Sequence, residues 1–323
     1  MPSPAANDIA ASPRVVIAIT TFKRNDGLAA LLGSIQDLSP LGGGWDFTGV
    51  VVVDNDPAGS AQEMVESAFP NVNYFCEPEP GIAAARNRSV AEAKALGATW
   101  VAFVDDDQTV TTSWLAELAN VAQSSQVDAV VGAVRFHRPP QTPEWFIGLG
   151  AFDDQLVDQA DMGGYFSTNN LLLRVDPWPV SPPLFDMRFG LTGGSDHHLG
   201  ARIRAMGGTI GYAPDALAEE TVLASRVNKK AAVKRILRYG NVLTRVELAV
   251  GEETGAQQSV IRVREGAAGI ARVGYGMLKA AVQLPQGTQG VARGLRTSFI
   301  GIGQLYAAGG GVVEEYRRKD PSR

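Results

Sequence analysis

The chain has 323 residues, of which 45% are hydrophobic and 20% charged, as in an ordinary globular protein. This length suits one large domain or two smaller ones. A net charge of -5 gives no reason to expect nucleic-acid binding. Because Cys76 is the sole cysteine, no intrachain disulfide can form, which favours a reducing compartment.

The two ends of the chain carry no clear targeting signal. Residues 1–13 are small and polar and lack the basic start and apolar core of a signal peptide, so we expect a disordered lead-in and a cytoplasmic protein. Residues 297–313 are uncharged but rich in glycine and alanine, which makes them a weak candidate for a membrane span.

Strand-like and helix-like patterns alternate from residue 14 to about residue 128. The apolar runs predict strands at residues 15–19, 50–53, 72–75 and 99–104, and the helical spacing predicts helices at residues 28–38, 82–96 and 114–121. Buried runs joined by amphipathic helices imply parallel strands with right-handed crossovers. The sequence therefore predicts an α/β fold with a doubly wound, mainly parallel sheet.

The pattern changes twice further along the chain. Strands are predicted at residues 130–136, 170–175 and 209–212, and a helix at residues 196–206. A later helical stripe consists of Val233, Ile236, Leu237, Leu243 and Val246, and the cations Lys229, Lys230, Lys234, Arg235 and Arg238 crowd its start. We expect Gly240 to interrupt this helix.

Three consecutive aspartates, Asp105, Asp106 and Asp107, close the strand at residues 99–104. Such a strand delivers its carboxylates to the carboxyl edge of the sheet, where open α/β folds bind ligands. Crowded carboxylates repel one another unless a cation holds them, and Mg²⁺ or Mn²⁺ prefers such oxygen ligands. The triplet therefore predicts a metal–diphosphate site, with a solvated acidic turn as the alternative.

Further motifs follow the same order as in a known family. They are Thr20-Thr21-Phe22-Lys23-Arg24, Val53-Asp54-Asn55-Asp56, Gly81 to Arg88, the aspartate triplet, Asn169 to Arg174, and Phe189 to Asp196. Their order and spacing resemble the bacterial family 2 glycosyltransferases, which have the GT-A fold. The resemblance implies a catalytic domain over residues 14–225, followed by a helical C-terminal region over residues 226–323.

The resemblance also implies roles for individual residues. Nucleotide-sugar contacts are expected from Thr21, Phe22, Arg24, Asp54, Arg86, Asp105 and Asp106. Thr21 and Phe22 could flank the nucleobase, and Asp54 could accept a hydrogen bond from a base imide. Each has an ordinary alternative, such as a βα turn or a turn aspartate.

Asp107 would bind Mn²⁺ or Mg²⁺, which neutralises charge on the departing nucleoside diphosphate. Related enzymes often supply a later histidine as a metal ligand, but residues 218–221 contain none. Either Glu220 takes that place, or the metal relies on Asp107, phosphates and water.

Asp196 is the expected general base of an inverting transfer, because a carboxylate there could take the proton of the acceptor hydroxyl. Family members commonly have Glu-Asp at this point, whereas this chain has Ser195-Asp196. The alternative for Asp196 is an acid in the first turn of a helix, which the helix dipole favours.

Two other functions compete with glycosyl transfer. Asp196-His197-His198 also resembles the DHH signature of manganese phosphoesterases, and a non-catalytic, membrane-associated scaffold could keep the same fold. Adjacent histidines on a helix point to different sides, which disfavours a shared metal.

The partners follow from the resemblance and from the basic stripe. The donor would be a nucleoside-diphosphate sugar, most often of uridine, and the acceptor a glycan, a lipid-linked glycan or a small hydroxyl compound. Residues 229–250 could lie on an anionic membrane as a basic amphipathic helix, or form a homo-oligomer contact.

Overall fold

The computed structural model describes residues 12–154, 166–176 and 183–314. Its strands are β1 (Arg14–Thr21), β2 (Asp46–Asp54), β3 (Val72–Cys76), β4 (Trp100–Asp105), β5 (Gln108–Val110), β6 (Ala129–His137), β7 (Asn170–Arg174) and β8 (Ile210–Thr221). Its α-helices are α1 (Asn25–Gln36), α2 (Gln62–Ala68), α3 (Ile82–Ala95), α4 (Trp114–Ser125), α5 (Glu144–Leu149), α6 (Ser195–Ala205), α7 (Lys229–Glu253), α8 (Gln258–Val282) and α9 (Gly287–Ala308). Short 3₁₀ turns lie at Met187–Phe189, Ala224–Arg226 and Leu284–Gln286.

The strands form one twisted sheet in the order β3-β2-β1-β4-β7-β6-β8-β5. β3, β2, β1 and β4 are parallel, β7 runs antiparallel to β4 and β6, and β6 and β8 are parallel. The predicted α/β class and the mainly parallel sheet are confirmed.

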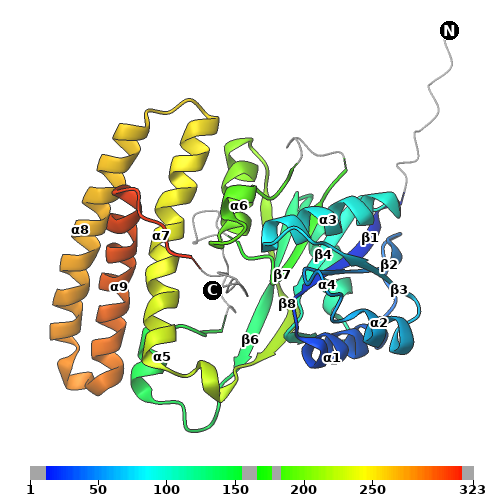
Figure 1. Ribbon diagram of the computed structural model, residues 1–323, viewed down its shortest axis with the longest axis horizontal. Helices are drawn as coiled ribbons and strands as arrows, with labels where there is room; N and C mark the ends of the chain where they lie inside the picture. The colour runs from blue at the N-terminus through cyan, green and yellow to red at the C-terminus, as the bar shows by residue number, and fades with distance from the viewer. Residues whose placement is uncertain (1–11, 155–165, 177–182, 315–323) are drawn as a thin grey trace.

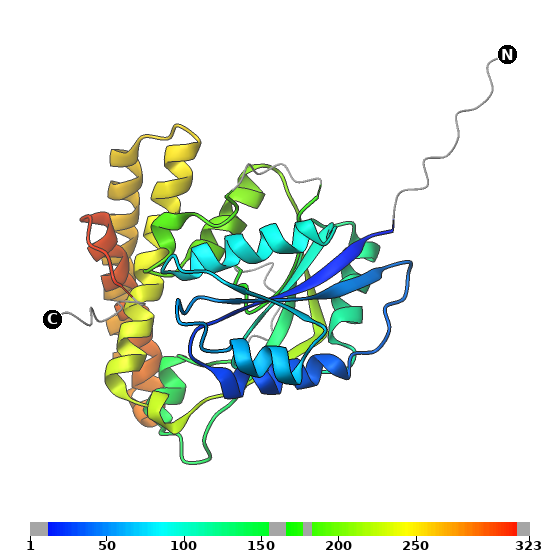
Figure 2. The same cartoon turned by 45° about the vertical axis from the view of Figure 1, so that its right-hand side comes forward.

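Helices cover both faces of the sheet, as Figure 2 shows for α3 above it and α1 and α2 below it. Alternate residues of β1 point to opposite faces, because side chains in a strand alternate. Ile17 belongs to the same core cluster as Leu31 of α1 and Leu118 of α4, whereas Ala18 belongs to the cluster on the other face, with the alanines of α3. The short alanines allow α3 to lie close to the sheet.

The strand order reverses between β1 and β4, because α1 and α2 cross on one face of the sheet and α3 on the other. At this switch point Thr20 pairs with Asp105, so the loop after β1 meets the aspartate triplet after β4. Open α/β sheets bind ligands at such points. The fold therefore places two of the predicted motifs side by side.

The sequence analysis missed β5, and β8 is longer than predicted. β5 follows the aspartate triplet directly and pairs antiparallel with the end of β8, so that Gln108 lies opposite Glu220. This pairing brings residues far apart in the chain to the carboxyl edge of β4.

Helices α7, α8 and α9 form a layer beside the sheet, with α8 outermost in Figure 1. The prediction that Gly240 interrupts a helix is wrong, because α7 continues from Lys229 to Glu253. A Cβ atom at Gly240 would collide with the carbonyl group of Ile300, so this glycine lets α9 approach α7 closely.

The predicted apolar stripe of α7 is mostly buried. Ile236, Leu243 and Val246 are at most 9% exposed. These three residues pack inside the protein, which was the alternative to membrane contact, so they are not available to acyl chains. Within the described residues, no helix is long and apolar enough to cross a membrane, including α9, which holds most of residues 297–313.

The division into a catalytic domain ending at residue 225 and a helical region remains a prediction. The last strand ends at Thr221 and α7 begins at Lys229, which is consistent with it, but α5 of the first part packs on α9. The predicted disordered N-terminus falls, apart from its last two residues, outside the described residues.

Candidate active site

The loop after β1 holds the aspartate triplet in place. Thr21 Oγ1 donates a hydrogen bond to Asp106 Oδ2 at 2.8 Å. Arg24 bridges Asp106 Oδ1 and Asp107 Oδ2, each at 2.9 Å from its Nη1. In the structure, Thr21 and Arg24 therefore contact the carboxylates that were predicted to share the site with them.

The start of α1 also lies against the triplet. A Cβ atom at Gly27 would come within 2.6 Å of the carbonyl oxygen of Asp106. A side chain there would have to push the helix away from the sheet edge. Gly27 thus allows the loop that carries Arg24 to close over the acidic residues.

Glu220 joins the triplet through the pairing of β5 with β8. Arg226 donates to Glu220 Oε1 at 2.8 Å and to Asp107 Oδ2 at 3.3 Å. Asp107 is thus flanked by two arginines, Arg24 and Arg226, and lies beside a second carboxylate. The sequence analysis considered Glu220 but missed Arg226, which lies beyond the resembling motifs.

The carboxylates at this edge repel one another. Burial raises the pKa of Asp105 to about 7, and the charges of Asp107, Asp106 and Asp196 add to the rise against Arg86. Burial likewise raises the pKa of Glu220 to about 7, with a further rise from Asp107 and an opposing effect of Arg226. The arginines therefore compensate the negative charge only in part.

The residues of this carboxylate cluster (Asp105, Asp106, Asp107 and Glu220) fit a divalent cation. They offer oxygen ligands, and burial, with a further contribution from the neighbouring like charges, raises the pKa of Asp105 and of Glu220 to about 7. A bound Mn²⁺ or Mg²⁺ would relieve that repulsion, and both ions favour carboxylate ligands.

Asp196 lies in the first turn of α6 and is only 9% exposed. Its Oδ1 accepts hydrogen bonds from the backbone N–H of His197 at 2.9 Å and lies 3.1 Å from His197 Nδ1. Burial alone would raise the pKa of Asp196, but His197 and Arg86 hold it well below its usual range. Asp196 is therefore ionised at neutral pH.

Arg86 connects the two acidic groups. It lies in the first part of α3, is 8% exposed, and donates to Ser195 Oγ at 3.2 Å. Its charge acts on both Asp105 and Asp196. Ser195, which replaces the glutamate common in the family, thus accepts a hydrogen bond from this arginine.

Helix α7 supports the loop before Asp196. Arg245 donates to Thr192 Oγ1 at 2.6 Å and to the carbonyl group of Arg188 at 3.1 Å. Gly194 adopts a φ of 99° directly under Val242, which a residue with a side chain could not do without strain. No motif indicated these contacts, because they depend on how the C-terminal helices pack.

Asp54 differs from its predicted role. It is fully buried, and its carboxylate accepts hydrogen bonds from Asp56 N–H, Ala61 N–H and Tyr74 Oη, at 2.9, 2.9 and 3.0 Å. This is the turn role that was its alternative, and it leaves no exposed oxygen for a nucleobase. Phe22, by contrast, is 41% exposed at the end of the same sheet edge, with Lys23 Nζ 5.3 Å from the centre of its ring.

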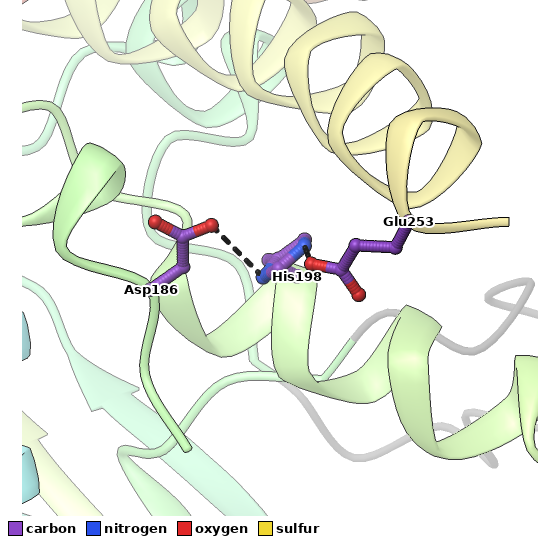
Figure 3. A group of neighbouring side chains, drawn as sticks. All are labelled: Asp186, His198 and Glu253. Atoms are coloured by element: carbon purple, nitrogen blue, oxygen red, sulfur yellow. Dashed lines mark ion pairs between the residues drawn. The ribbon is translucent and has the colours of Figure 1, made fainter. Parts of the chain in front are cut away.

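A second acidic group, formed by Asp186, His198 and Glu253, lies between α6 and α7 (Figure 3). The ring of His198 is fully buried between the two carboxylates, with Nδ1 4.0 Å from Asp186 and Nε2 3.2 Å from Glu253. Arginines already engage both acids: Arg188 pairs with Asp186 at 2.6 Å and Arg202 with Glu253 at 3.0 Å. His197 faces Asp196 instead, so the adjacent histidines share no site, as predicted.

Comparison with known proteins agrees with this geometry. Residues 16–175 match the sequence model of glycosyl transferase family 2. A curated relative, the succinoglycan biosynthesis protein ExoM of Rhizobium meliloti, is 33% identical over 198 residues, which cover 59% of this chain and 62% of that protein. The chain thus spans less than two thirds of the length of this relative.

Solved structures share the fold at low sequence identity. The mannosyltransferase PcManGT of Pyrobaculum calidifontis, solved with GDP-Man and Mn²⁺, aligns with a TM-score of 0.57 and 19% identity over 95% of this chain and 90% of that one. GalNAc-T7, solved with UDP, GalNAc and Mn²⁺, aligns with a TM-score of 0.50 and 14% identity over 73% of this chain and 48% of that one. With the GT-A fold and this match, residues 16–175 belong to glycosyl transferase family 2.

Proposed function

We propose that this protein transfers a sugar from a nucleoside-diphosphate sugar to a hydroxyl acceptor in polysaccharide synthesis. The observation that carries the proposal is the carboxylate cluster at the switch point of a family 2 sheet, with the ionised Asp196 beside it. The name of the relative ExoM, a succinoglycan biosynthesis protein, supports polysaccharide synthesis as the process.

The donor would bind at the carboxyl edge of β1 and β4. Asp107, with Asp105 and Glu220 near it, would hold Mn²⁺ or Mg²⁺, which would stabilise the departing diphosphate as a Lewis acid. Arg24 and Arg226 already lie at this edge and would pair with phosphate oxygens. Phe22 offers an exposed ring for the nucleobase, and we propose uridine as the commonest base for such sites.

Asp196 would act as the general base. His197 fixes its Oδ1, and among the described residues no hydrogen-bond donor contacts Oδ2, which leaves that oxygen for the acceptor hydroxyl. The proton of the hydroxyl would pass to Asp196 as the oxygen attacks the anomeric carbon. A single displacement from the face opposite the diphosphate inverts the anomeric configuration.

The manganese phosphoesterase alternative has little support in the geometry. That chemistry would need His198 to face the aspartate triplet, but His198 lies between Asp186 and Glu253. A non-catalytic scaffold should not bind a sugar donor, so an assay of donor binding distinguishes it from a glycosyltransferase.

The test begins with a panel of nucleotide sugars in a thermal-shift assay with and without Mn²⁺. A donor that binds the native state raises the unfolding midpoint. We expect UDP-sugars to raise it in the presence of Mn²⁺, and Asp107→Ala to remove the shift without unfolding the protein. A panel without any Mn²⁺-dependent shift would favour the scaffold.

The reaction itself is followed by the proton NMR coupling constant of the anomeric proton in early product. The proposal predicts that the product has the configuration opposite to that of the donor. Retained configuration would reject the role of Asp196 in a single displacement, although not the family or the fold.

A further inference from the structure

Helix α8 has an unusual distribution of side chains. Most of its large apolar residues, unlike the buried Ile261, point outward: Val263, Ile270 and Met277 are 73, 65 and 58% exposed. Spaced seven residues apart, they lie on one face of the helix. Val260, Leu278 and Val282 are also exposed and widen this face, so a broad apolar stripe faces away from the protein.

Small residues make up most of the inward face of α8, beside the buried Ile261 and Glu265. Gly269, Gly276 and Ala280 are buried against α9. A Cβ atom at Gly269 would come within 2.9 Å of the carbonyl oxygen of Gly301, so the two helices pack backbone to backbone. Small residues inside and large apolar residues outside reverse the usual pattern of helices in water and are typical of helices that contact lipid.

Charge on the two outer helices points to the nature of the partner. Residues 258–308 contain six cations and one acid, a net charge of +5, whereas the whole chain carries -5, so the remainder carries -10. The one acid, Glu265, is buried and contacts Gln304 of α9 at 3.2 Å. Arg264 and Arg296 pair with Glu247 and Asp153 of neighbouring segments, and the outer surface of the two helices also has Arg272 and Lys279 but no exposed acid of its own.

We propose that α8 docks this protein on an anionic lipid surface, with the α8 face (Val260, Val263, Ile270, Met277, Leu278 and Val282) in the interface and the cations toward the headgroups. An amphipathic helix with basic residues beside its apolar face binds membranes in this way. The outermost position of α8 in Figure 1 leaves this face accessible. The surface differs from the stripe of α7, which is buried.

A second copy of this chain is the other candidate for the α8 face. Two such faces in contact would bring the cations of both copies together, with no exposed acid on α8 or α9 to pair with them. Anionic headgroups complement the same charges. The charge pattern therefore favours lipid over a dimer.

The test is co-sedimentation with vesicles of equal parts phosphatidylglycerol and phosphatidylcholine, and with phosphatidylcholine alone, at low and at high salt. We expect binding to the anionic vesicles at low salt. The double variant Ile270→Gln/Met277→Gln should lower partitioning at least about tenfold, because it removes two apolar contacts. Arg272→Gln/Lys279→Gln should weaken binding and reduce its dependence on salt.

The matched control is Phe47→Ser, which removes an exposed apolar side chain from β2, far from the helical layer in Figure 1. It should bind vesicles like the unchanged protein. Light scattering after size exclusion tests the dimer: a dimer that Ile270→Gln/Met277→Gln dissociates would overturn the proposal. Absence of binding of the unchanged protein to anionic vesicles at low salt would also overturn the proposal.

The charge variant keeps the apolar face intact, so it tests the proposal even if the apolar variant folds poorly. Because the α8 face contributes nothing to the carboxylate cluster, donor binding should be the same in every variant. Failure of lipid binding would leave the proposed transfer reaction untouched, and failure of transfer would leave the docking surface in place.

Discussion

The two groups of acidic residues differ in how their charge is compensated. In the carboxylate cluster, burial and mutual repulsion raise the pKa of Asp105 and of Glu220 to about 7. At the second group, burial opposes ionisation of Asp186, but hydrogen bonds from Arg188 hold its pKa below the usual range. Arginines contact acids in both groups, but in the carboxylate cluster they offset the negative charge only in part, whereas in the second group they hold the pKa of Asp186 below its usual range.

Closely spaced acidic residues alone therefore do not identify the metal site of this protein. The group formed by Asp186, His198 and Glu253 has ligand atoms within 4.8 Å of one another and resembles a metal site. Arginines pair with carboxylates in both groups: Arg188 and Arg202 pair with Asp186 and Glu253 here, and Arg24 and Arg226 contact the carboxylate cluster. The carboxylate cluster gains more from a cation because repulsion remains there.

The largest effect is expected on the rate of transfer when Asp196, beside the carboxylate cluster, is replaced. Asp196→Asn keeps the shape of the side chain but removes the base, so transfer should slow by about 10²–10⁴-fold with donor affinity nearly unchanged. Steady-state kinetics and calorimetric titration of UDP measure the two quantities. Near-normal turnover would reduce Asp196 to a helix-terminal acid.

The next prediction compares the two acidic groups directly. Asp107→Asn should weaken Mn²⁺-dependent binding of UDP by several kcal/mol, about 100-fold or more. Glu253→Gln, the matched change in the second group, should leave that affinity as it is. Calorimetric titration of UDP with and without Mn²⁺ measures both affinities. Equal losses of affinity in the two variants would contradict the placement of the metal at the carboxylate cluster.

A smaller effect concerns pH. Asp105 and Glu220 must lose their protons to hold a cation, so Mn²⁺-dependent affinity for UDP should fall about tenfold per pH unit, for each proton displaced, below their pKa of about 7. In Glu220→Gln the dependence should be shallower. A titration series from pH 5 to pH 8, at about one-unit steps, measures it.

The same groups affect stability with a definite sign. A carboxyl group whose folded-state pKa is raised binds its proton more tightly when folded, so the free energy of unfolding falls as pH rises from its ordinary value of 4.5 toward about 7. Glu220→Gln should therefore stabilise the metal-free protein at pH 8 relative to pH 5. Denaturant unfolding at both pH values tests this, and an equal effect at both would reject it.

The smallest effect on binding is expected at His198. Its ring is fully buried and stacks on Phe189 at 5.1 Å, so His198→Gln should cost about 1–3 kcal/mol of stability. Because we expect no Mn²⁺ to bind at His198, any increase in the free energy of unfolding on adding Mn²⁺ should be the same in the unchanged protein and in His198→Gln. Unfolding curves of both proteins with and without Mn²⁺ would show a difference if the group held a metal.

The sequence by itself determined the class of fold and the approximate position of the site. Alternating apolar runs and helical spacing predicted the parallel strands, and the acids after residue 104 indicated the binding edge, because strand ends and periodicity are local properties of the chain. The order of the motifs indicated the family. None of these features requires knowledge of which distant residues meet.

Tertiary structure decided the partners of each group. Only the pairing of β5 with β8 brings Glu220 and Arg226 to Asp107, and only the packing of α7 brings Arg245 to the loop before Asp196. The sequence also did not indicate that Asp54 is buried, or that the apolar face of α7 is mostly buried while that of α8 is exposed. A helical pattern shows that one face is apolar, but whether protein covers that face depends on contacts between segments far apart in the chain.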